Sequence, residues 1–461
     1  METTQHKLVR GPVILEDIHS SGRCMARING KYVYLDKGIP GEAVTFTLER
    51  RKGFRGGTTT EVSEPSPHRI KPFCRHYDTC GGCPWQHIDY LHQLELKRRI
   101  LCNALVKYGI KTPEVLGVIA SPEIQLYRHR MEYAFSAAAC CEGQNSGAYC
   151  PSLGFHAPGE PGRVISIREC NLQADPCRAI CDFTEGFALD QGMDFFDHET
   201  RTGFLRSLSL RVNQKGEIMV LLGISEDRPE QREKLLSGLI HAFPQITSLN
   251  YTVHLTSSHG QMQGDIIPFG NMLPFLYETI AGYRFRIHAS SFFQPNIRQA
   301  EQIFLTARNW AELRGNESVI DLYTGVGTFA LFLSPGAAHV TGIEGSPFAV
   351  EDAKENARIN DIHNTTFLTG DILETFRPRF LEEHGKPNMI VLDPPRAGTL
   401  IEIKKTINAS GADKVLYLSC NPVSLAFDLK QLTGVYHVMR IQPFDMLPHT
   451  QHLETLVMLE K

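Results

Sequence analysis

From residue 290 onward, the chain alternates between amphipathic helical segments and short, almost uninterrupted apolar runs. The first helix is predicted over residues 296–313. The strand-like runs are 319–323, 339–344, 366–368, 389–393 and 414–419. Strands that are apolar along their whole length are buried on both faces, which is typical of a parallel sheet covered by helices. Ligands bind such α/β sheets beyond the carboxyl ends of the strands, so we expect the candidate chemistry of this region at that edge.

The first 68 residues follow a different pattern, in which short segments of β-branched and aromatic residues are separated by glycine turns. The dipeptide Asn29-Gly30 is a strong hairpin signal. Several short strands with regular turns predict a small closed β-barrel of OB-like type over residues 1–68.

Residues 69–289 lie between these two regions and are mainly strand-like. They include a long amphipathic helix at 87–108, which can pack on the C-terminal domain and has Gly109 as its predicted stop. The stretch from 127 to about 283 reads as strands interrupted by one short helix. For a chain of 461 residues about three domains are expected, and we predict a barrel, a central mainly-β domain and an α/β domain at 290–461.

Charge and composition indicate the surroundings of the protein. Lys and Arg exceed Asp and Glu in the first 111 residues, whereas the whole chain has a formal net charge of −4. A basic region on an acidic body is typical of contact with a polyphosphate such as RNA, and a solvated basic surface gives the same pattern. Within it, residues 50–57 combine basic side chains with Phe54, a ring that can stack on a base.

No apolar run has the length of a membrane helix, and the N-terminus lacks the apolar core of a signal peptide. We therefore expect a cytoplasmic protein with no membrane association, and the sequence implies no obligate protein partner. In such a protein, the twelve cysteines favour metal binding or chemistry over disulfides.

Three cysteines, Cys74, Cys80 and Cys83, lie within ten residues, and two glycines allow a tight turn between the last two. A fourth thiol must come from elsewhere; Cys170 is our choice, with Cys177 and Cys181 as rivals. Four thiolates suit an iron–sulfur cluster or structural zinc. Zinc sites usually show a second short pair of cysteines, which is missing here, so the three-plus-one spacing favours an iron–sulfur cluster that joins distant parts of the chain.

The first strand of the α/β region runs into Asp321-Leu-Tyr-Thr-Gly-Val-Gly327, whose glycines allow the backbone to approach a cofactor. This is not the three-glycine dinucleotide fingerprint, so NAD is disfavoured. Glu344 ends the second strand and can accept the two ribose hydroxyls. Asp371 follows a later strand and is a candidate for the adenine amino group. Together they form the usual layout for S-adenosylmethionine and favour a class I methyltransferase over a dehydrogenase.

Cys420 follows the predicted strand 414–419 and precedes Asn421-Pro422, which holds it in a sharp turn. A single cysteine near apolar strands is most often buried and inert. The proline, the polar neighbours and the sequence Asp393-Pro-Pro-Arg396 favour an accessible thiol instead. A nucleophilic thiolate needs a polar environment that lowers its pKa, and we expect this for Cys420.

A cysteine beside a methyl donor indicates chemistry at carbon 5 of uracil, which is too weak a nucleophile to take a methyl group directly. Thiolate addition to carbon 6 gives an enolate whose carbon 5 can attack the sulfonium methyl. A base must then remove the carbon 5 proton so that the cysteine can leave, and Glu454 in His452-Leu-Glu454 is the candidate base. Asp393 can orient the base edge, and Arg396 can stabilise the enolate or a phosphate.

The sequences Asp393-Pro-Pro-Arg396, Ser419-Cys-Asn-Pro422 and His452-Leu-Glu454 together closely resemble those of the RNA uridine-5-methyltransferase family. The resemblance spans essentially the whole chain. It implies an N-terminal TRAM-like RNA-binding barrel, a Rossmann-like class I methyltransferase domain, S-adenosyl-L-methionine as methyl donor and 5-methyluridine in 23S rRNA or tRNA as product.

By motif matching, the resemblance also implies the site residues. Cys420 would be the nucleophile and Glu454 the base. The implied cofactor contacts are Gln294, in Ser291-Phe-Phe-Gln-Pro-Asn296, together with Tyr323, Glu344 and Asp393. The cysteines that fall where the rRNA branch of the family binds a 4Fe–4S cluster are Cys74, Cys80, Cys83 and Cys170. A TRAM-like segment and a cluster in one chain favour 23S rRNA over tRNA as substrate.

Three positions depart from the family pattern. Pro295 and Thr324 replace more usual residues, and Phe427 stands where an arginine is common, which we expect to affect target choice rather than reaction type. Three other classes fit the sequence less well. A cytosine-5 RNA methyltransferase would carry a Pro-Cys nucleophile motif, and a non-catalytic iron–sulfur RNA-binding protein would not need Cys420 together with Glu454. A radical methyltransferase would have three residues between its first two cluster cysteines, whereas this chain has five.

Overall fold

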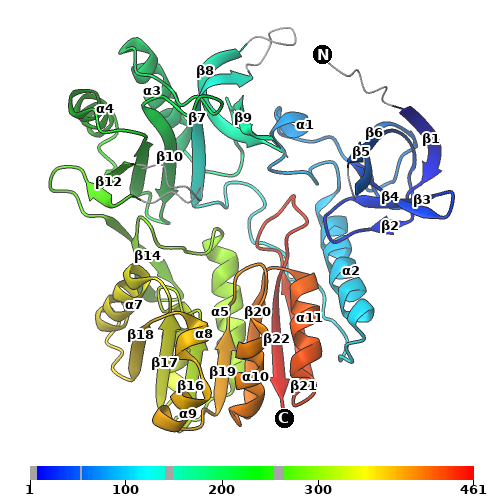
Figure 1. The fold of residues 1–461 in the computed structure, drawn as a ribbon, viewed down its shortest axis with the longest axis vertical. Helices are drawn as coiled ribbons and strands as arrows, with labels where there is room; N and C mark the ends of the chain where they lie inside the picture. The colour runs from blue at the N-terminus through cyan, green and yellow to red at the C-terminus, as the bar shows by residue number, and fades with distance from the viewer. Residues whose placement is uncertain (1–7, 52–53, 141–148, 159, 254–263) are drawn as a thin grey trace. The chain divides into compact units, whose positions relative to one another are not determined.

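The computed structural model describes residues 8–51, 54–140, 149–158, 160–253 and 264–461. The chain forms two compact units, each assembled from separate pieces of sequence (Figure 1). The first unit combines Met1–Phe73, Gly82–Ser121 and Asp393–Lys461, and the second combines Cys74–Gly81 with Pro122–Leu392. The RNA contact predicted at 50–57 includes residues 52 and 53, which lie outside the described residues.

The first unit begins with a six-stranded sheet in the order β1-β5-β6-β4-β3-β2 (Figure 1). Its strands are β1 Leu8–Ile14, β2 Asp17–Ile18, β3 Cys24–Ile28, β4 Lys31–Asp36, β5 Ala43–Arg51 and β6 Phe54–Glu64. Asn29 and Gly30, both with positive φ, form the predicted turn between β3 and β4. Val44, Phe46 and Leu35 are fully buried in its core. Within the described residues β1 and β2 lie at opposite edges, so the small β domain is a half-barrel rather than the closed barrel that we predicted.

The long helix of the first unit is α2, Tyr90–Tyr108. The Asp89 side chain accepts a hydrogen bond from His92 N (3.1 Å) and caps its start, and Gly109, with φ +68°, ends it. The helix therefore begins three residues later than predicted, because the cap lies at residue 89. It packs against α11, Pro422–Leu432, which follows the C-terminal strands described next.

Three C-terminal strands of the first unit are antiparallel and run in the order β20-β22-β21. They are β20 Lys414–Ser419, β21 His437–Phe444 and β22 Glu454–Glu460, with the helix α10 at Ile401–Ala409. The interior of β20 is almost fully buried, as expected from its unbroken apolarity, and so is that of β22, which was not predicted from sequence.

The second unit contains a seven-stranded sheet in the order β13-β12-β11-β10-β7-β8-β9. Its strands are β7 Arg130–Cys140, β8 Tyr149–Ala157, β9 Glu160–Ser166, β10 Leu205–Val212, β11 Ile218–Ile224, β12 Ile246–Val253 and β13 Ile266–Pro268. The predicted helix near 231–243 is present as α4, Pro229–Ala242. A second helix, α3 (Cys177–Asp190), lies where only strands were predicted, and α3 and α4 pack together. Cys150 is disulfide-bonded, contrary to the expectation for a protein without disulfides.

The second unit also contains four parallel strands in the order β18-β17-β16-β19, which confirms the predicted parallel α/β arrangement. They are β16 Ser318–Leu322, β17 His339–Glu344, β18 Thr365–Thr369 and β19 Met389–Leu392, accompanied by α5 Ile297–Ala311, α6 Thr328–Leu333, α7 Pro347–Ile359, α8 Ile372–Thr375 and α9 Pro378–His384 (Figure 1). A hairpin of β14 Phe275–Ile280 and β15 Tyr283–His288 precedes them and contacts α7. Among the described residues, no helix has the length and apolarity needed to cross a membrane.

Candidate active site

Cys420 lies between the end of β20 and the start of α11. Asn421 Oδ1 accepts a hydrogen bond from Val423 N (3.1 Å) and caps α11, while Asn421 N donates to Ser419 Oγ (3.2 Å). The antiparallel register pairs Ser419 with Thr455. The next residue in each direction is Cys420 on one strand and Glu454 on the other, so the sheet itself brings the predicted nucleophile and base to the same end of neighbouring strands.

The environment of Cys420 differs from the one predicted. Burial, together with the Glu454 and Asp393 carboxylates, raises the pKa of the thiol to about 12, while Arg396 opposes them. The expected lowering of the pKa is therefore wrong for this structure. The reason is that two acidic groups and partial burial outweigh one guanidinium.

Glu454 is the first residue of β22. Burial, with a smaller contribution from the charge of Asp393, raises the pKa of its carboxyl group to about 8. A carboxyl group with a pKa near the working pH can both hold and release a proton, which is the property required of a general acid–base group.

The loop that follows Asp393 is hydrogen-bonded to the turn that carries Cys420. Arg396 O accepts hydrogen bonds from Asn421 Nδ2 (3.1 Å) and Ser424 Oγ (3.2 Å). Because one backbone carbonyl of the loop accepts from two side chains of the turn, the two segments are fixed with respect to each other. The Asp393–Arg396 loop therefore lies beside the Cys420 turn in the first unit, as expected from sequence.

Asp428 is a buried carboxylate that joins three elements around this turn. It accepts hydrogen bonds from Thr399 N (2.8 Å) and Tyr417 Oη (2.6 Å), and it forms an ion pair with Lys404 of α10. A Cβ atom on Gly398, whose φ is +85°, would lie 2.5 Å from Asp428 Oδ2, so glycine is needed at that position.

Phe427 is 42% exposed on α11. Its ring makes an edge-on contact with Tyr108 of α2, with centroids 6.0 Å apart, and the Lys404 ammonium lies 4.9 Å from its centroid. In this chain the residue that stands in place of an arginine therefore packs on an aromatic ring and carries a cation beside it.

The glycine-containing loop after β16 lies in the second unit. Asp321 is fully buried there, and its Oδ2 accepts hydrogen bonds from Thr324 Oγ1 (2.6 Å) and Ala330 N (3.1 Å). Burial raises the pKa of Asp321 to about 7, although these hydrogen bonds oppose the effect. Tyr323, Gly325 and Gly327 all have positive φ, so the loop is sharply turned. Thr324, a departure from the family pattern, is thus part of the loop's own support.

Two acidic residues follow the next strands as predicted. Glu344 ends β17, and its two oxygens accept hydrogen bonds from Gly325 N (3.2 Å) and Ser346 N (2.8 Å). Each oxygen keeps a lone pair, so the carboxylate can still accept from ribose hydroxyls. Asp371 follows β18 and caps α8 by accepting from Leu373 N (2.8 Å) and Glu374 N. The sharply turned loop after β16, the Glu344 carboxylate and Asp371 after the next strand together fit an adenosyl cofactor.

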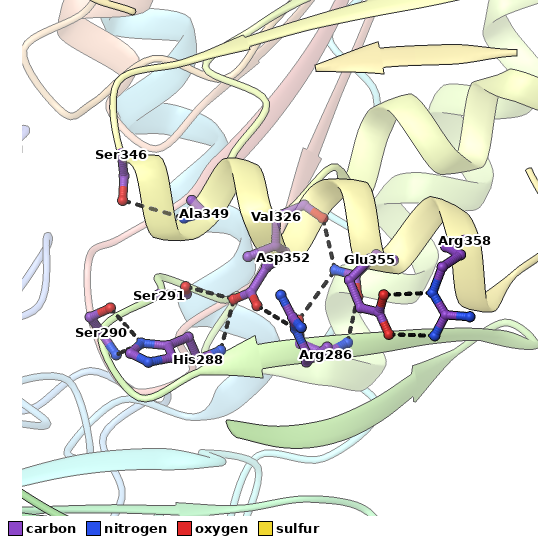
Figure 2. A network of polar contacts seen from close by, with 11 residues as sticks. Arg286, His288, Ser290, Ser291, Val326, Ser346, Ala349, Asp352, Glu355 and Arg358 are labelled. Atoms are coloured by element: carbon purple, nitrogen blue, oxygen red, sulfur yellow. Dashed lines mark hydrogen bonds and ion pairs between the residues drawn. The ribbon is translucent and has the colours of Figure 1, made fainter. Parts of the chain in front are cut away.

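The loop that carries Gln294 is held by α7. Asp352, which is 1% exposed, accepts hydrogen bonds from Ser291 Oγ and His288 N (both 2.8 Å) and pairs with Arg286 Nε (2.8 Å). Asn356, one turn later, donates to Val326 O (3.0 Å) in the glycine loop. Figure 2 shows this network, in which one face of α7 joins the segment before Gln294 to the loop after β16.

The four cysteines predicted as metal ligands are divided between the units. Cys74, Cys80 and Cys170 belong to the second unit, and Cys83 to the first. Cys74 lies close enough to Cys170 to contribute to its raised pKa, although burial is the larger cause. Cys80 and Cys170 pack against one apolar cluster of Ala157, Ile165 and Ile167.

A hydrogen bond also joins the segment of Cys74 and Cys80 to the segment of Cys170: Arg168 N donates to Nε2 of the buried His76 (3.1 Å). In the described part of the chain, however, no three His, Cys, Asp or Glu side chains are arranged to hold a metal ion. A 4Fe–4S cluster is therefore not supported by the structure itself.

Several residues that build the site were not predicted from sequence, among them Asp352, Asn356 and Asp428. Each lies in the middle of a helix, where polar residues usually face solvent. The one signal in the sequence was proximity to residues already identified. Asp428 follows Phe427, and Asp352 lies about one turn into the helix that follows Glu344.

Comparison with known proteins agrees with this site. The sequence profile of the tRNA (uracil-5-)-methyltransferase family matches residues 280–461. An "Uncharacterized RNA methyltransferase" of Porphyromonas gingivalis is 35% identical over 459 residues, which cover 96% of this chain and 98% of the relative. One of Bacteroides thetaiotaomicron is 36% identical over 451 residues, which cover 96% and 99%.

A solved structure is similar along almost the whole chain. The crystal structure of Pyrococcus abyssi tRNA (uracil-54, C5)-methyltransferase in complex with S-adenosyl-L-homocysteine superposes with a TM-score of 0.75 at 25% sequence identity, covering 97% of this chain and 100% of that one. The matched profile includes both Cys420 and Glu454. Similarity of sequence and fold over nearly the full length shows that the chain belongs to the RNA uracil-5-methyltransferase family and is an RNA methyltransferase.

Proposed function

We propose that this enzyme methylates carbon 5 of a uridine in 23S rRNA, with Cys420 as nucleophile and Glu454 as base. The observation that carries the proposal is the register of β20 and β22, which puts these two residues at the same strand ends. Their charges also interact, since Glu454 contributes to the raised pKa of Cys420.

The residues of this chain perform the following steps. The Cys420 thiol releases its proton to water as its sulfur bonds to carbon 6 of the uracil, and the electrons of the carbon 5–carbon 6 double bond move onto the ring carbonyl to give the enolate. Arg396, the group that opposes the raised pKa of the thiol, favours the thiolate and the developing enolate. S-adenosylmethionine, when bound, supplies the methyl group that carbon 5 takes up.

Glu454 acts after the methyl group has been added. Its carboxylate takes the proton from carbon 5, the double bond to carbon 6 re-forms, and the bond from carbon 6 to the Cys420 sulfur breaks to release the thiolate. A raised pKa makes the carboxylate a stronger base than an ordinary glutamate, and about 8 is close to the optimum for proton transfer near neutral pH.

We assign the cofactor contacts to Gln294, Tyr323, Glu344, Asp371 and Asp393. The hydrogen-bonded loop of Asp321, Thr324 and Glu344 supports this assignment, as does the S-adenosyl-L-homocysteine bound to the Pyrococcus relative.

We also propose a division into an RNA-binding TRAM-like domain at 1–68, a central domain at 69–289 and a methyltransferase domain at 290–461. The half-barrel sheet supports the first of these assignments. Cys74, Cys80, Cys83 and Cys170 would hold a structural 4Fe–4S cluster. This assignment rests on the family resemblance.

The enzyme has two candidate substrates, 23S rRNA and tRNA. The names of the family profile and of the Pyrococcus relative both include tRNA. For this reason tRNA is the alternative substrate that we retain. The TRAM-like sheet together with the cysteine set resembles the rRNA branch and favours 23S rRNA.

The test supplies methyl-labelled S-adenosylmethionine with unmodified 23S rRNA or unmodified tRNA, followed by nucleoside analysis. We expect label in 5-methyluridine from rRNA. Label only in tRNA would overturn the substrate assignment, label in 5-methylcytidine would overturn the base assignment, and no label in either RNA would overturn the proposed activity.

A further inference from the structure

Residues 445–453 connect β21 to β22 in the first unit, and Glu454 follows them directly. The start of this connection is held by α2. Lys97 forms a buried ion pair with Asp445 and donates from Nζ to Leu447 O (3.1 Å). Neither the lysine nor the aspartate side chain is exposed to solvent. Asp445 N also donates to Ile119 O (2.9 Å), so this end of the connection is fixed by side chain and backbone together.

Gln93, one turn earlier on α2, holds the middle of the connection through its carboxamide. Its Oε1 accepts from His449 N (2.9 Å), and its Nε2 lies 3.3 Å from His449 Nδ1. The same Nε2 donates to Trp85 O (3.1 Å) and Ile88 O (2.9 Å). Gln93 is fully buried, and His449 has a φ of +65°. One side chain therefore fixes a left-handed residue of the connection to the turn before α2.

Trp85 extends this contact to the N-terminal sheet. Its backbone N donates to His449 O (3.0 Å), and its indole Nε1 donates to Gly22 O (3.0 Å) in the turn between β2 and β3. A Cβ atom on Gly22, whose φ is +82°, would lie 2.8 Å from the Cβ of Gln451. The turn of the N-terminal sheet is thus in direct contact with the connection, three residues before Glu454.

We propose that Gln93 and Trp85 are positioning residues for the general base. They hold residues 445–453 in the conformation that presents the Glu454 carboxylate to the Cys420 adduct, and through Gly22 they join this connection to the N-terminal sheet. The inference rests on the proposed role of Glu454. The N-terminal sheet, to which we assign RNA binding, is therefore connected to Glu454 through Trp85 and residues 445–453.

The two chemical steps should differ in their dependence on these residues. Among the described residues, the hydrogen bonds that hold the Cys420 turn join residues 396, 419, 421, 423 and 424, all of which lie outside α2 and outside residues 445–453. Glu454 is the first residue of its strand, so it follows the connection more closely than the rest of β22 does. Loss of Gln93 or Trp85 contacts should slow elimination and leave addition of the thiol nearly intact.

Gln93→Met removes all four carboxamide contacts at similar side-chain volume, and the milder Trp85→Phe removes the indole donor but keeps an aromatic ring at this buried position. The measurements are the rates of formation and release of the covalent RNA adduct, the affinity for RNA and the melting temperature. For Gln93→Met we expect release and turnover to slow by about tenfold or more, since small misplacements of a catalytic group cost rates of this order. We expect Trp85→Phe to act in the same direction but more weakly. Formation and RNA affinity should change by less than about threefold.

Tyr436→Phe is the matched control, because it removes a buried hydrogen bond to Ile407 O (3.2 Å) in the same unit without touching residues 445–453. It should lower the melting temperature without prolonging the adduct. Glu454→Gln is measured in parallel.

If Glu454→Gln accumulates the adduct and Gln93→Met does not, the positioning role is overturned while the base stands. If Gln93→Met slows formation and release equally, as a purely structural defect would, the positioning role is likewise overturned. If Glu454→Gln turns over normally, the proposed base itself is wrong and the inference falls with it.

Discussion

Asp428 offers the sharpest test of how the turn around Cys420 is held together. Its carboxylate and the Lys404 ammonium are each 1% exposed. Asp428→Asn keeps the size of the side chain and can still accept hydrogen bonds from Thr399 N and Tyr417 Oη. It leaves the Lys404 charge buried without a counter-charge, and breaking a buried pair in this way costs about 3–5 kcal/mol of folding free energy.

The double variant Asp428→Asn/Lys404→Met separates charge from packing. Removing both charges avoids the uncompensated ammonium, so most of the loss should be recovered and the double variant should lie within about 1–2 kcal/mol of the native protein. Glu460→Gln is the control: its pair with Lys414 spans 3.7 Å between partly exposed side chains. Such a pair contributes at most about 1 kcal/mol.

The assay is urea unfolding followed by tryptophan fluorescence. The chain has two tryptophans, and in a Trp310→Phe background the buried Trp85 reports on the first unit. A loss below about 1 kcal/mol for Asp428→Asn would refute the reasoning, because the pair would then behave as an exposed one. A double variant no more stable than the single one would refute it as well, because the buried charge would not be the cause.

Three further predictions concern the chemistry and the cysteines. Cys420→Ala should abolish methylation but leave S-adenosylmethionine binding unchanged by isothermal titration; any retained turnover would contradict the nucleophilic role. Because burial and Asp393 raise the pKa of Glu454 to about 8, its carboxylate fraction increases about tenfold per pH unit below that value. The rate of adduct release should therefore increase from about pH 6 to about pH 8 and then level off, and a flat profile would exclude Glu454 as the base. Cys74→Ser should lose iron and sulfide under anaerobic purification and lower the melting temperature, whereas native protein that contains zinc and no iron would disprove the cluster.

The parts of the fold that follow from local sequence were predictable. The parallel strands at 318–322, 339–344 and 389–392 are apolar along their length because helices cover both faces, and that pattern is visible in the chain. Helix α3 was missed because its sequence, Cys177–Asp190, contains aromatic and β-branched residues together with Gly186, which are poor local signals for a helix. Packing against α4 and the sheet, which no local window contains, decides its conformation.

The candidate site was predictable where a short motif carries the chemistry and not where distant residues support it. Cys420 and Glu344 stand at the ends of predicted strands, whereas Glu454 was found from its short motif and its strand, β22, was not predicted. The supporting residues Gln93, Asp352 and Asp428 are polar positions within helices, and only the tertiary structure shows that they are buried. The raised pKa of Cys420 was equally hidden, because it depends on Glu454, which is 34 residues away in sequence but adjacent in the sheet.

The most direct test of the central claim is to trap the covalent intermediate. Glu454→Gln is incubated with S-adenosylmethionine and unmodified 23S rRNA, the complex is digested with protease and nuclease, and the peptides are analysed by mass spectrometry. The account predicts a methylated uridine bonded to the peptide that contains Cys420, and no such species with Cys420→Ala. Normal turnover of Glu454→Gln without any accumulated adduct, or an adduct on another residue, would contradict it.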